Sequence, residues 1–150
     1  MTNSQDNLEP TGAIAIIYRQ TDEGREFLLV QQKSGNLSVA GGGKENIDHD
    51  IDDTIVREIG EELNLTKDQY SIQELDFVHE FIYGPWKKER AGQLAKNKVY
   101  LLKVKPNVKI VPNLEEIVGA FWVKEEEVFK RLTLEDLKEI FKKAIAKINE

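Results

Sequence analysis

Three glutamates share one face of a short amphipathic helix that the sequence predicts from Asp50 to Leu63. Glu58, Glu61 and Glu62 stand at positions i, i+3 and i+4, which a helix brings together on one side. They lie next to the apolar stripe of the helix, which consists of Ile55, Val56, Ile59 and Leu63. Helix stability gives no reason for such a cluster, because like charges at this spacing repel each other. A divalent cation would relieve the repulsion, since carboxylate oxygens are the ligands that Mg²⁺ and Mn²⁺ prefer.

Three consecutive glycines, Gly41–Gly43, come shortly before this helix. Glycine lets the backbone approach a ligand closely, and a glycine loop that leads into a helix offers amides or carbonyls to a phosphate and its metal. Three glycines alone carry little information. Followed by a face of carboxylates, they predict a site for a metal ion and a polyanion.

This stretch resembles the Nudix box, a family pattern written G-x5-E-x7-R-E-U-x-E-E-x-G-U, in which U is a large aliphatic residue. Anchored on Arg57, the match runs from Gly43 to Leu65 and retains Gly43, Arg57, Glu58, Ile59, Glu61, Glu62 and Leu65. The resemblance implies an α/β fold, the Nudix α/β/α sandwich with a mixed β-sheet. It also implies a hydrolase that cleaves a pyrophosphate linkage in a nucleoside di- or triphosphate derivative by water attack at phosphorus.

Two positions depart from the family pattern. His49 stands where the pattern has its first glutamate, which in the family often pairs with the box arginine. Asp48 or Asp50 could substitute for it, and a shifted alignment of Gly42 and Asp48, with one extra residue before Arg57, is an alternative. Asn64 replaces a glycine just after the helix. Asparagine tolerates the left-handed conformation better than other non-glycine residues, so we expect this change to cost little.

The resemblance further implies a role for each matching residue. We expect Mg²⁺, with Mn²⁺ as a substitute, held by Glu58, Glu61, Glu62, the Gly42 carbonyl and a late glutamate, Glu116 or its neighbour Glu115. Either Glu58 or Glu61 would be the general base, and Arg57 would orient the glutamates.

Basic residues are concentrated in one segment of a chain whose formal net charge is −6. Residues 84–109 contain eight lysines and arginines and a single acidic residue. We expect the substrate to contact Gly43 and Lys44 beside the helix, and Trp86, Lys87 and Arg90 in the basic segment. Cations would bind the outer phosphates and Trp86 would stack on a base.

The same charge distribution bears on partners. A net acidic chain binds nucleic acid poorly in general, which favours a nucleotide-type small molecule as the substrate. The 5′ end of an RNA is one alternative. A non-catalytic nucleotide-binding module that regulates a partner is another, motivated by His49. Many Nudix proteins form homodimers, but no exposed apolar stripe in this sequence demands one.

Apolar runs and turn residues predict the remaining elements. Strands are expected at 12–18, 27–30, 37–40, 72–83, 97–105 and 119–123, and helices at 50–63, 125–131 and from Thr133 onward. Thr133 would cap the last helix, with Asp136 three residues later. We expect a flexible tail at 1–10 and a single domain at 11–150. The chain has no cysteine, which excludes thiolate sites, and its polar start and lack of long apolar runs favour a cytoplasmic protein that does not bind membranes.

Overall fold

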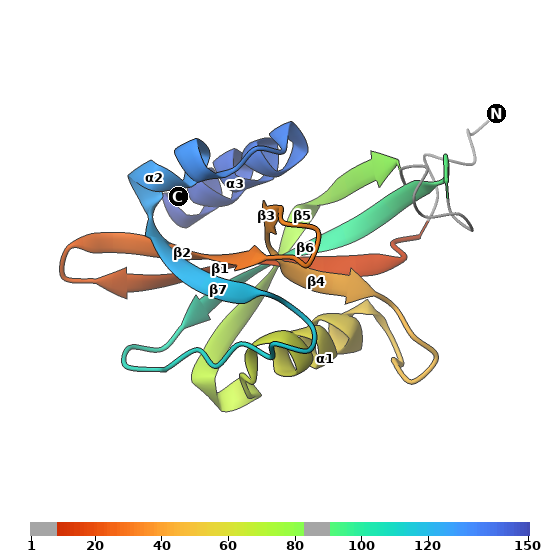
Figure 1. The fold of residues 1–150 in the computed structure, drawn as a ribbon, viewed down its shortest axis with the longest axis horizontal. Coiled ribbons are helices and arrows are strands. Elements are labelled where there is room, and N and C mark those ends of the chain that lie inside the picture. Colours follow the sequence, from red (N-terminus) through yellow and green to blue (C-terminus); the bar gives the residue numbers. More distant parts are fainter. Residues whose placement is uncertain (1–8, 83–90) are drawn as a thin grey trace.

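A mixed seven-stranded sheet separates two helical layers (Figure 1). The computed structural model describes residues 9–82 and 91–150. The strands are β1 (Gly12–Thr21), β2 (Gly24–Gln31), β3 (Leu37–Ser38), β4 (Ala40–Gly43), β5 (Tyr70–Ile82), β6 (Leu94–Val104) and β7 (Gly119–Lys124). The helices are α1 (Ile51–Leu63), a short 3-10 helix η2 (Lys67–Gln69), α2 (Glu125–Arg131) and α3 (Glu135–Ile148). None of the helices in the described ranges has the length and apolar character required to cross a membrane.

Strand β1 lies at the centre of the sheet. It pairs in parallel with β6 along one edge, from Gly12 opposite Asn97 to Tyr18 opposite Lys103. Along its other edge the first half pairs with β4 and the second half with β2, both antiparallel. Strand β2 also pairs with β3 and β7, and β5 pairs with β6. The glycines of β4 are thereby fixed next to the most buried strand.

Both faces of β1 are buried, which confirms what its unbroken apolar run predicts. Ala13, Ala15 and Ile17 pack in the core cluster that contains the apolar stripe of α1. Ile14 and Ile16 pack in the second cluster, with α2 and α3. In Figure 1, α1 lies below the sheet and α2 and α3 lie above it. The α/β sandwich with a mixed sheet is therefore confirmed.

The glycines form a strand, whereas the sequence favoured a loop. Gly41–Gly43 belong to β4, and Gly42 and Gly43 pair with Ala13 and Gly12 of β1. Gly41 has a positive φ of 156°, and a Cβ there would overlap the carbonyl oxygen of Ala13. Glycine is thus required at this position by the close approach of two strands.

The ends of α1 are built as the sequence predicts. Asp50 is the N-cap, and its carboxylate accepts a hydrogen bond of 2.9 Å from the Asp53 N–H. Asn64 ends the helix in the left-handed conformation, with φ 55°, and its N–H donates to the Gly60 carbonyl. The carboxamide of Asn64 also donates to the Val111 carbonyl at 2.7 Å, so asparagine does more at this position than replace a glycine.

The expected cap of α3 is wrong. The helix begins at Glu135 with Leu134 at its N-cap, and no side chain caps it. The carboxylate of Asp136, which a capping box would direct back to the helix start, instead accepts a hydrogen bond from His79 on β5. The hydrogen bond to His79 therefore uses the Asp136 side chain that the local sequence predicts as part of the cap.

Candidate functional site

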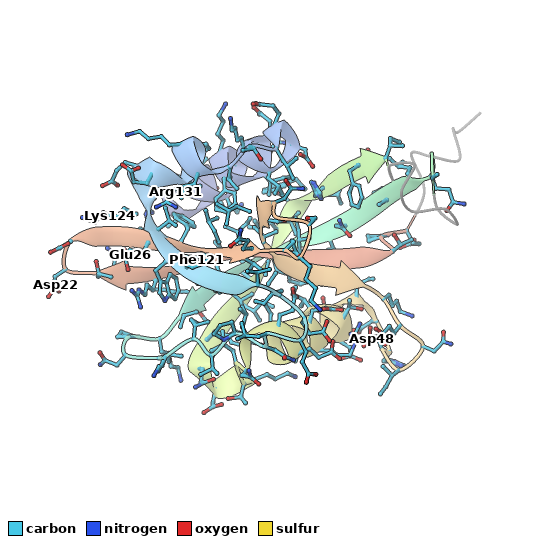
Figure 2. All side chains as sticks on the ribbon, in the orientation of Figure 1. Asp22, Glu26, Asp48, Phe121, Lys124 and Arg131 are labelled. Atoms are coloured by element: carbon cyan, nitrogen blue, oxygen red, sulfur yellow. The ribbon has the colours of Figure 1, made fainter. Side chains whose placement is uncertain are left out.

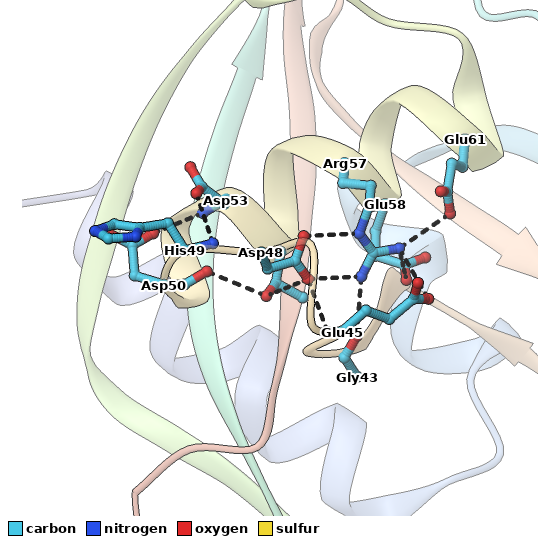
Figure 3. A network of polar contacts seen from close by, with 10 residues as sticks. Gly43, Glu45, Asp48, His49, Asp50, Asp53, Arg57, Glu58 and Glu61 are labelled. Carbon is cyan, nitrogen blue, oxygen red and sulfur yellow. Dashed lines mark hydrogen bonds and ion pairs between the residues drawn. The ribbon is translucent and has the colours of Figure 1, made fainter.

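The guanidinium of Arg57 is the centre of the polar network at α1 (Figure 3). Its Nε and Nη2 donate to the two carboxylate oxygens of Asp48 at 2.9 and 2.8 Å, and Nη2 also donates to the Gly43 carbonyl at 3.0 Å. On the other side, Nη1 donates to Glu58 at 3.0 Å and to Glu61 at 3.2 Å. Arg57 therefore joins the loop after β4 to two of the three glutamates.

Of the three residues considered for the place of the first glutamate of the family pattern, Asp48 is the one that binds Arg57 in the described structure, rather than His49 or Asp50. The Asp48 residue is only 5% exposed, and it also accepts hydrogen bonds from the Glu45 N–H and the Thr54 hydroxyl at 2.9 and 3.0 Å. The Arg57 guanidinium holds the pKa of the Asp48 carboxyl well below its usual range. The imidazole of His49 points away from Arg57, as Figure 3 shows. The shifted alignment of Gly42 and Asp48 with the family pattern is thus the one that the geometry supports.

Glu62 is buried against the glycine strand. The residue is 5% exposed, and its carboxylate accepts a hydrogen bond of 3.0 Å from the Gly41 N–H. Burial raises the pKa of Glu62 to about 8, because the charged form loses its hydration. Burial also raises the pKa of Glu58, although the adjacent Arg57 opposes this shift. A Cβ on Gly42 would overlap the Glu58 carboxylate, so only glycine permits this contact between β4 and α1.

The loop before β7 brings Glu116 to the same end of α1. Asn113 makes the connection: its N–H donates to the Glu62 carbonyl at 2.8 Å and its carboxamide to the Glu61 carbonyl at 2.9 Å. The charge of Glu116 is among the causes of the raised pKa of Glu62. Sequence reasoning missed Asn113. The Pro-Asn pair at 112–113 indicates a turn, but no sequence signal names its partners.

The donor set suits a hard divalent cation, because it consists of carboxylate and carbonyl oxygens around partly buried negative charge. Within residues 9–82 and 91–150, no three Asp, Glu or His side chains converge on one point as a finished metal site. Arg57 instead makes ion pairs with both Glu58 and Glu61. The assignment of individual metal ligands stays a prediction from the sequence.

A cavity of about 210 Å³ lies beside β4, next to the second core cluster. No Asp, Glu, Lys or Arg is among the described residues that line it. These are Thr11, Ile14, Gln32, Ser38, Val39, Gly41, Gly42, Gly43, His79, Phe81, Asn97 and Leu137. Because Gly42 also contacts Glu58, the strand separates this uncharged cavity from the carboxylates by backbone alone. Two larger hollows near the first turn of α1 share Glu74, and none of Glu58, Glu61 and Glu62 lines either of them.

Two of the five expected substrate-binding residues, Gly43 and Lys44, lie in the described part of the chain. Gly43 lines the cavity, and Lys44 follows it as an exposed residue whose N–H donates to the Thr11 carbonyl. Trp86, Lys87 and Arg90 lie outside the described residues. Sequence reasoning missed His79 and Asn97, which lie on the two adjacent strands β5 and β6. Figure 2 shows Asp48 near α1, at the opposite end of the view from Asp22 in the β1–β2 turn.

Asp48→Asn should disconnect Arg57 from its loop while His49→Asn should not. We expect the first variant to lose about 10- to 100-fold in activity and to melt at lower temperature, because it removes a charge-assisted bidentate pair. The folded-state pKa of Asp48 is depressed, so its contribution is present above the unfolded value and is lost as the pH falls. The stability difference from wild type should therefore shrink below about pH 4. Melting curves and rates for the two variants check this, and equal losses in both would contradict the assignment.

Glu62→Gln should stabilise the metal-free protein at alkaline pH. The folded state binds the Glu62 proton more tightly than the unfolded chain, so wild-type stability falls as pH rises from 4.5 to about 8. Glutamine keeps an acceptor for the Gly41 N–H and carries no charge. The gain should be absent near pH 4.5 and on the order of a few kcal/mol at pH 8 in denaturant titrations with EDTA. Glu61→Gln on the same helix is the matched control, and a gain independent of pH would show that the buried charge of Glu62 is not its cause.

The model of the NUDIX domain family matches residues 9–145. No curated protein sequence matches the chain. A Caenorhabditis elegans Ap4A hydrolase in a binary complex is similar in structure, with a TM-score of 0.78 at 22% identity over 94% of this chain and 98% of that one. An Escherichia coli dihydroneopterin triphosphate pyrophosphohydrolase gives a TM-score of 0.76 at 14% identity over 93% and 97%.

A third similar structure is the NUDIX domain of Shewanella oneidensis NrtR complexed with ADP ribose, with a TM-score of 0.74 at 14% identity and 99% of both chains covered. Identities this low show a shared fold, whereas the family model matches residues 9–145, nearly the whole chain. The chain therefore belongs to the Nudix family of hydrolases.

Proposed function

We propose that the protein is a metal-dependent pyrophosphohydrolase that cleaves a pyrophosphate linkage in a nucleoside di- or triphosphate derivative. One observation carries the proposal. Arg57 is fixed by Asp48 and the Gly43 carbonyl and in turn contacts Glu58 and Glu61, so the acidic face of α1 is held beside the glycine strand. Such an arrangement suits a polyanionic substrate only if a cation neutralises the acidic groups.

Glu58, Glu61, Glu62, the Gly42 carbonyl and Glu116 would hold Mg²⁺ or Mn²⁺. The ion, when bound, neutralises phosphate oxygens and lowers the pKa of the attacking water. Glu58 or Glu61 would accept the proton of that water. Arg57 would keep both glutamates in place, since a guanidinium has enough donors to bind three carboxylates and a carbonyl at once.

The uncharged cavity beside Gly42 and Gly43 would receive the part of the substrate that carries no phosphate. Among the described residues, four apolar and five polar side chains line it, so it offers both packing surface and hydrogen-bonding groups to a small molecule. An Ap4A hydrolase, a dihydroneopterin triphosphate pyrophosphohydrolase and a domain bound to ADP ribose are among the similar structures, which supports a nucleotide-type substrate. Lys44, Lys87 and Arg90 would contact the phosphates, and Trp86 a base.

The rival function is a nucleotide-binding module without catalysis. It was suggested by His49, which stands where the family pattern has a glutamate. Because Asp48 forms the ion pair with Arg57, the departure at His49 gives little support for a loss of catalysis. The NUDIX domain of NrtR complexed with ADP ribose is similar in fold, and this similarity supports the alternative of a nucleotide sensor. A panel of nucleotides, nucleotide sugars, dinucleoside polyphosphates and 5′-triphosphorylated RNA, incubated with Mg²⁺, separates these functions. Tight binding without turnover across the panel would establish the sensor.

Glu61→Gln and Glu62→Gln should each retain the fold and lose at least about 100-fold in turnover. The loss of one metal ligand or base removes several kcal/mol of transition-state stabilisation. Glu139→Gln on the exposed side of α3 is the control and should turn over normally. Product formation on the best substrate of the panel is the readout. Near wild-type rates in both α1 variants would overturn the proposed site.

Millimolar Mg²⁺ or Mn²⁺ should raise the melting temperature relative to EDTA, because the acidic cluster exists only in the folded state. Calcium should bind but support little turnover, since its looser coordination positions water poorly. In the Glu62→Gln variant the rise in melting temperature with Mg²⁺ should shrink. Identical melting curves with and without metal, together with activity in EDTA, would exclude a metal-dependent mechanism.

A further inference from the structure

One row of residues crosses the sheet beside the uncharged cavity, and three of its four members line the cavity: His79, Asn97 and Gly43. His79 on β5 lies opposite Asn97 on β6, Asn97 lies opposite Gly12 on β1, and Gly12 lies opposite Gly43 on β4. The carboxamide of Asn97 occupies the space that a side chain at position 12 would fill, because a Cβ on Gly12 would lie 2.6 Å from Asn97 Oδ1. Asn97 is therefore directed along the row toward the glycine strand.

The orientation of this carboxamide is fixed from α3. His79 Nε2 lies 2.6 Å from a carboxylate oxygen of Asp136, and His79 Nδ1 lies 3.2 Å from Asn97 Nδ2. A carboxylate only accepts, so the Nε2 proton of His79 is donated to Asp136. When this is the only proton on the imidazole, the lone pair lies on Nδ1 and accepts from the Asn97 amide group. The chain Asp136–His79–Asn97 thus determines which end of the carboxamide is the donor.

One N–H and the oxygen of the Asn97 carboxamide stay available for a ligand. Within the described residues, Nδ2 uses one of its two hydrogens on His79, and Oδ1 receives no hydrogen bond. A fixed donor next to a fixed acceptor matches the N7 and N6 groups of adenine, whereas guanine presents two acceptors at the same edge. Phe81, whose ring lies 5.5 Å from that of His79, adds an aromatic wall to the cavity.

We propose that Asn97 reads the base of the substrate, that it selects an adenine-type edge over a guanine-type edge, and that His79 and Asp136 are the positioning residues that set its orientation. This deepens the proposed function, because it assigns a base class to the same enzyme and rests on that function. The residues that select the base come from β5, β6 and α3, and none of them belongs to the acidic cluster of α1.

Asn97→Leu is the direct test. It keeps the size of the side chain and removes both polar groups. We measure kcat and KM on adenine and guanine versions of one nucleotide, which share the same phosphate chain. Wild type should prefer adenine, and the variant should lose about tenfold of that preference, mainly through KM for the adenine substrate. Gln73→Leu, on an exposed position of the same sheet, is the matched control and should keep the preference.

The positioning residues are tested by a pair of substitutions at one site. His79→Gln retains a donor for Asp136 and an acceptor for Asn97, so it should keep most of the preference for adenine. His79→Leu and Asp136→Asn should lower the preference without a matching fall in kcat. A merely structural role would instead lower stability and both substrates' rates together. Melting curves show whether each variant folds.

The outcomes separate the two proposals. If the wild-type protein hydrolyses none of the panel, the proposed function fails, and base preference is then read from binding of the same nucleotides by calorimetry. If the protein is active but prefers guanine, or if Asn97→Leu keeps the wild-type ratio, the assignment of Asn97 is overturned. If His79→Leu and His79→Gln behave alike, the positioning role of His79 is overturned.

Discussion

The ion pair between Arg57 and Asp48 is the contact on which the rest of the site depends. Arg57 points back from α1, and Asp48 is the buried residue of a loop that is otherwise largely exposed. Breaking a largely buried pair of this kind leaves an uncompensated charge, which is expensive in a folded protein. With the pair intact, the loop between β4 and α1 is tied to the helix, and the Gly43 carbonyl and two glutamates share one guanidinium. Arg57 and Asp48 thereby hold the acidic face of α1 in a fixed position next to the glycine strand β4.

The glutamates also show what burial does to a cluster of like charges. The Glu62 carboxylate accepts a hydrogen bond from the Gly41 N–H, but burial and the neighbouring Glu58 and Glu116 carboxylates raise its pKa. Glu58, with Arg57 beside it, is shifted in the same direction against the opposing effect of that positive charge. A protein gains no stability from such an arrangement, and sites of this kind are commonly functional.

The sequence predicted the elements well where side chains repeat with a clear period. The apolar stripe of α1, its Asp50 cap and the buried run of β1 are all present in the structure. It could not predict β4, because glycines have no side chains and therefore no periodicity to read. The cap at Thr133 failed for a different reason, since Asp136 binds a residue 57 positions earlier in the chain. Separation in the sequence also explains why the cavity could not be predicted. His79, Asn97 and Asp136 belong to no local motif, and they meet only when the sheet and α3 are assembled.

Strand β4 has a consequence for how such an enzyme changes over evolutionary time. Only the backbone of Gly41 and Gly42 in β4 separates the carboxylates from the cavity, because these residues have no side chains. Substitution of these glycines is not tolerated, because a side chain at Gly41 would overlap Ala13 and a side chain at Gly42 would overlap Glu58. If Asn97 reads the base as proposed, changes in the recognised base would arise on β5, β6 and α3, away from the α1 groups that are proposed to react. After a gene duplication, substitutions on β5, β6 and α3 could then change the recognised substrate while the residues of α1 stay the same.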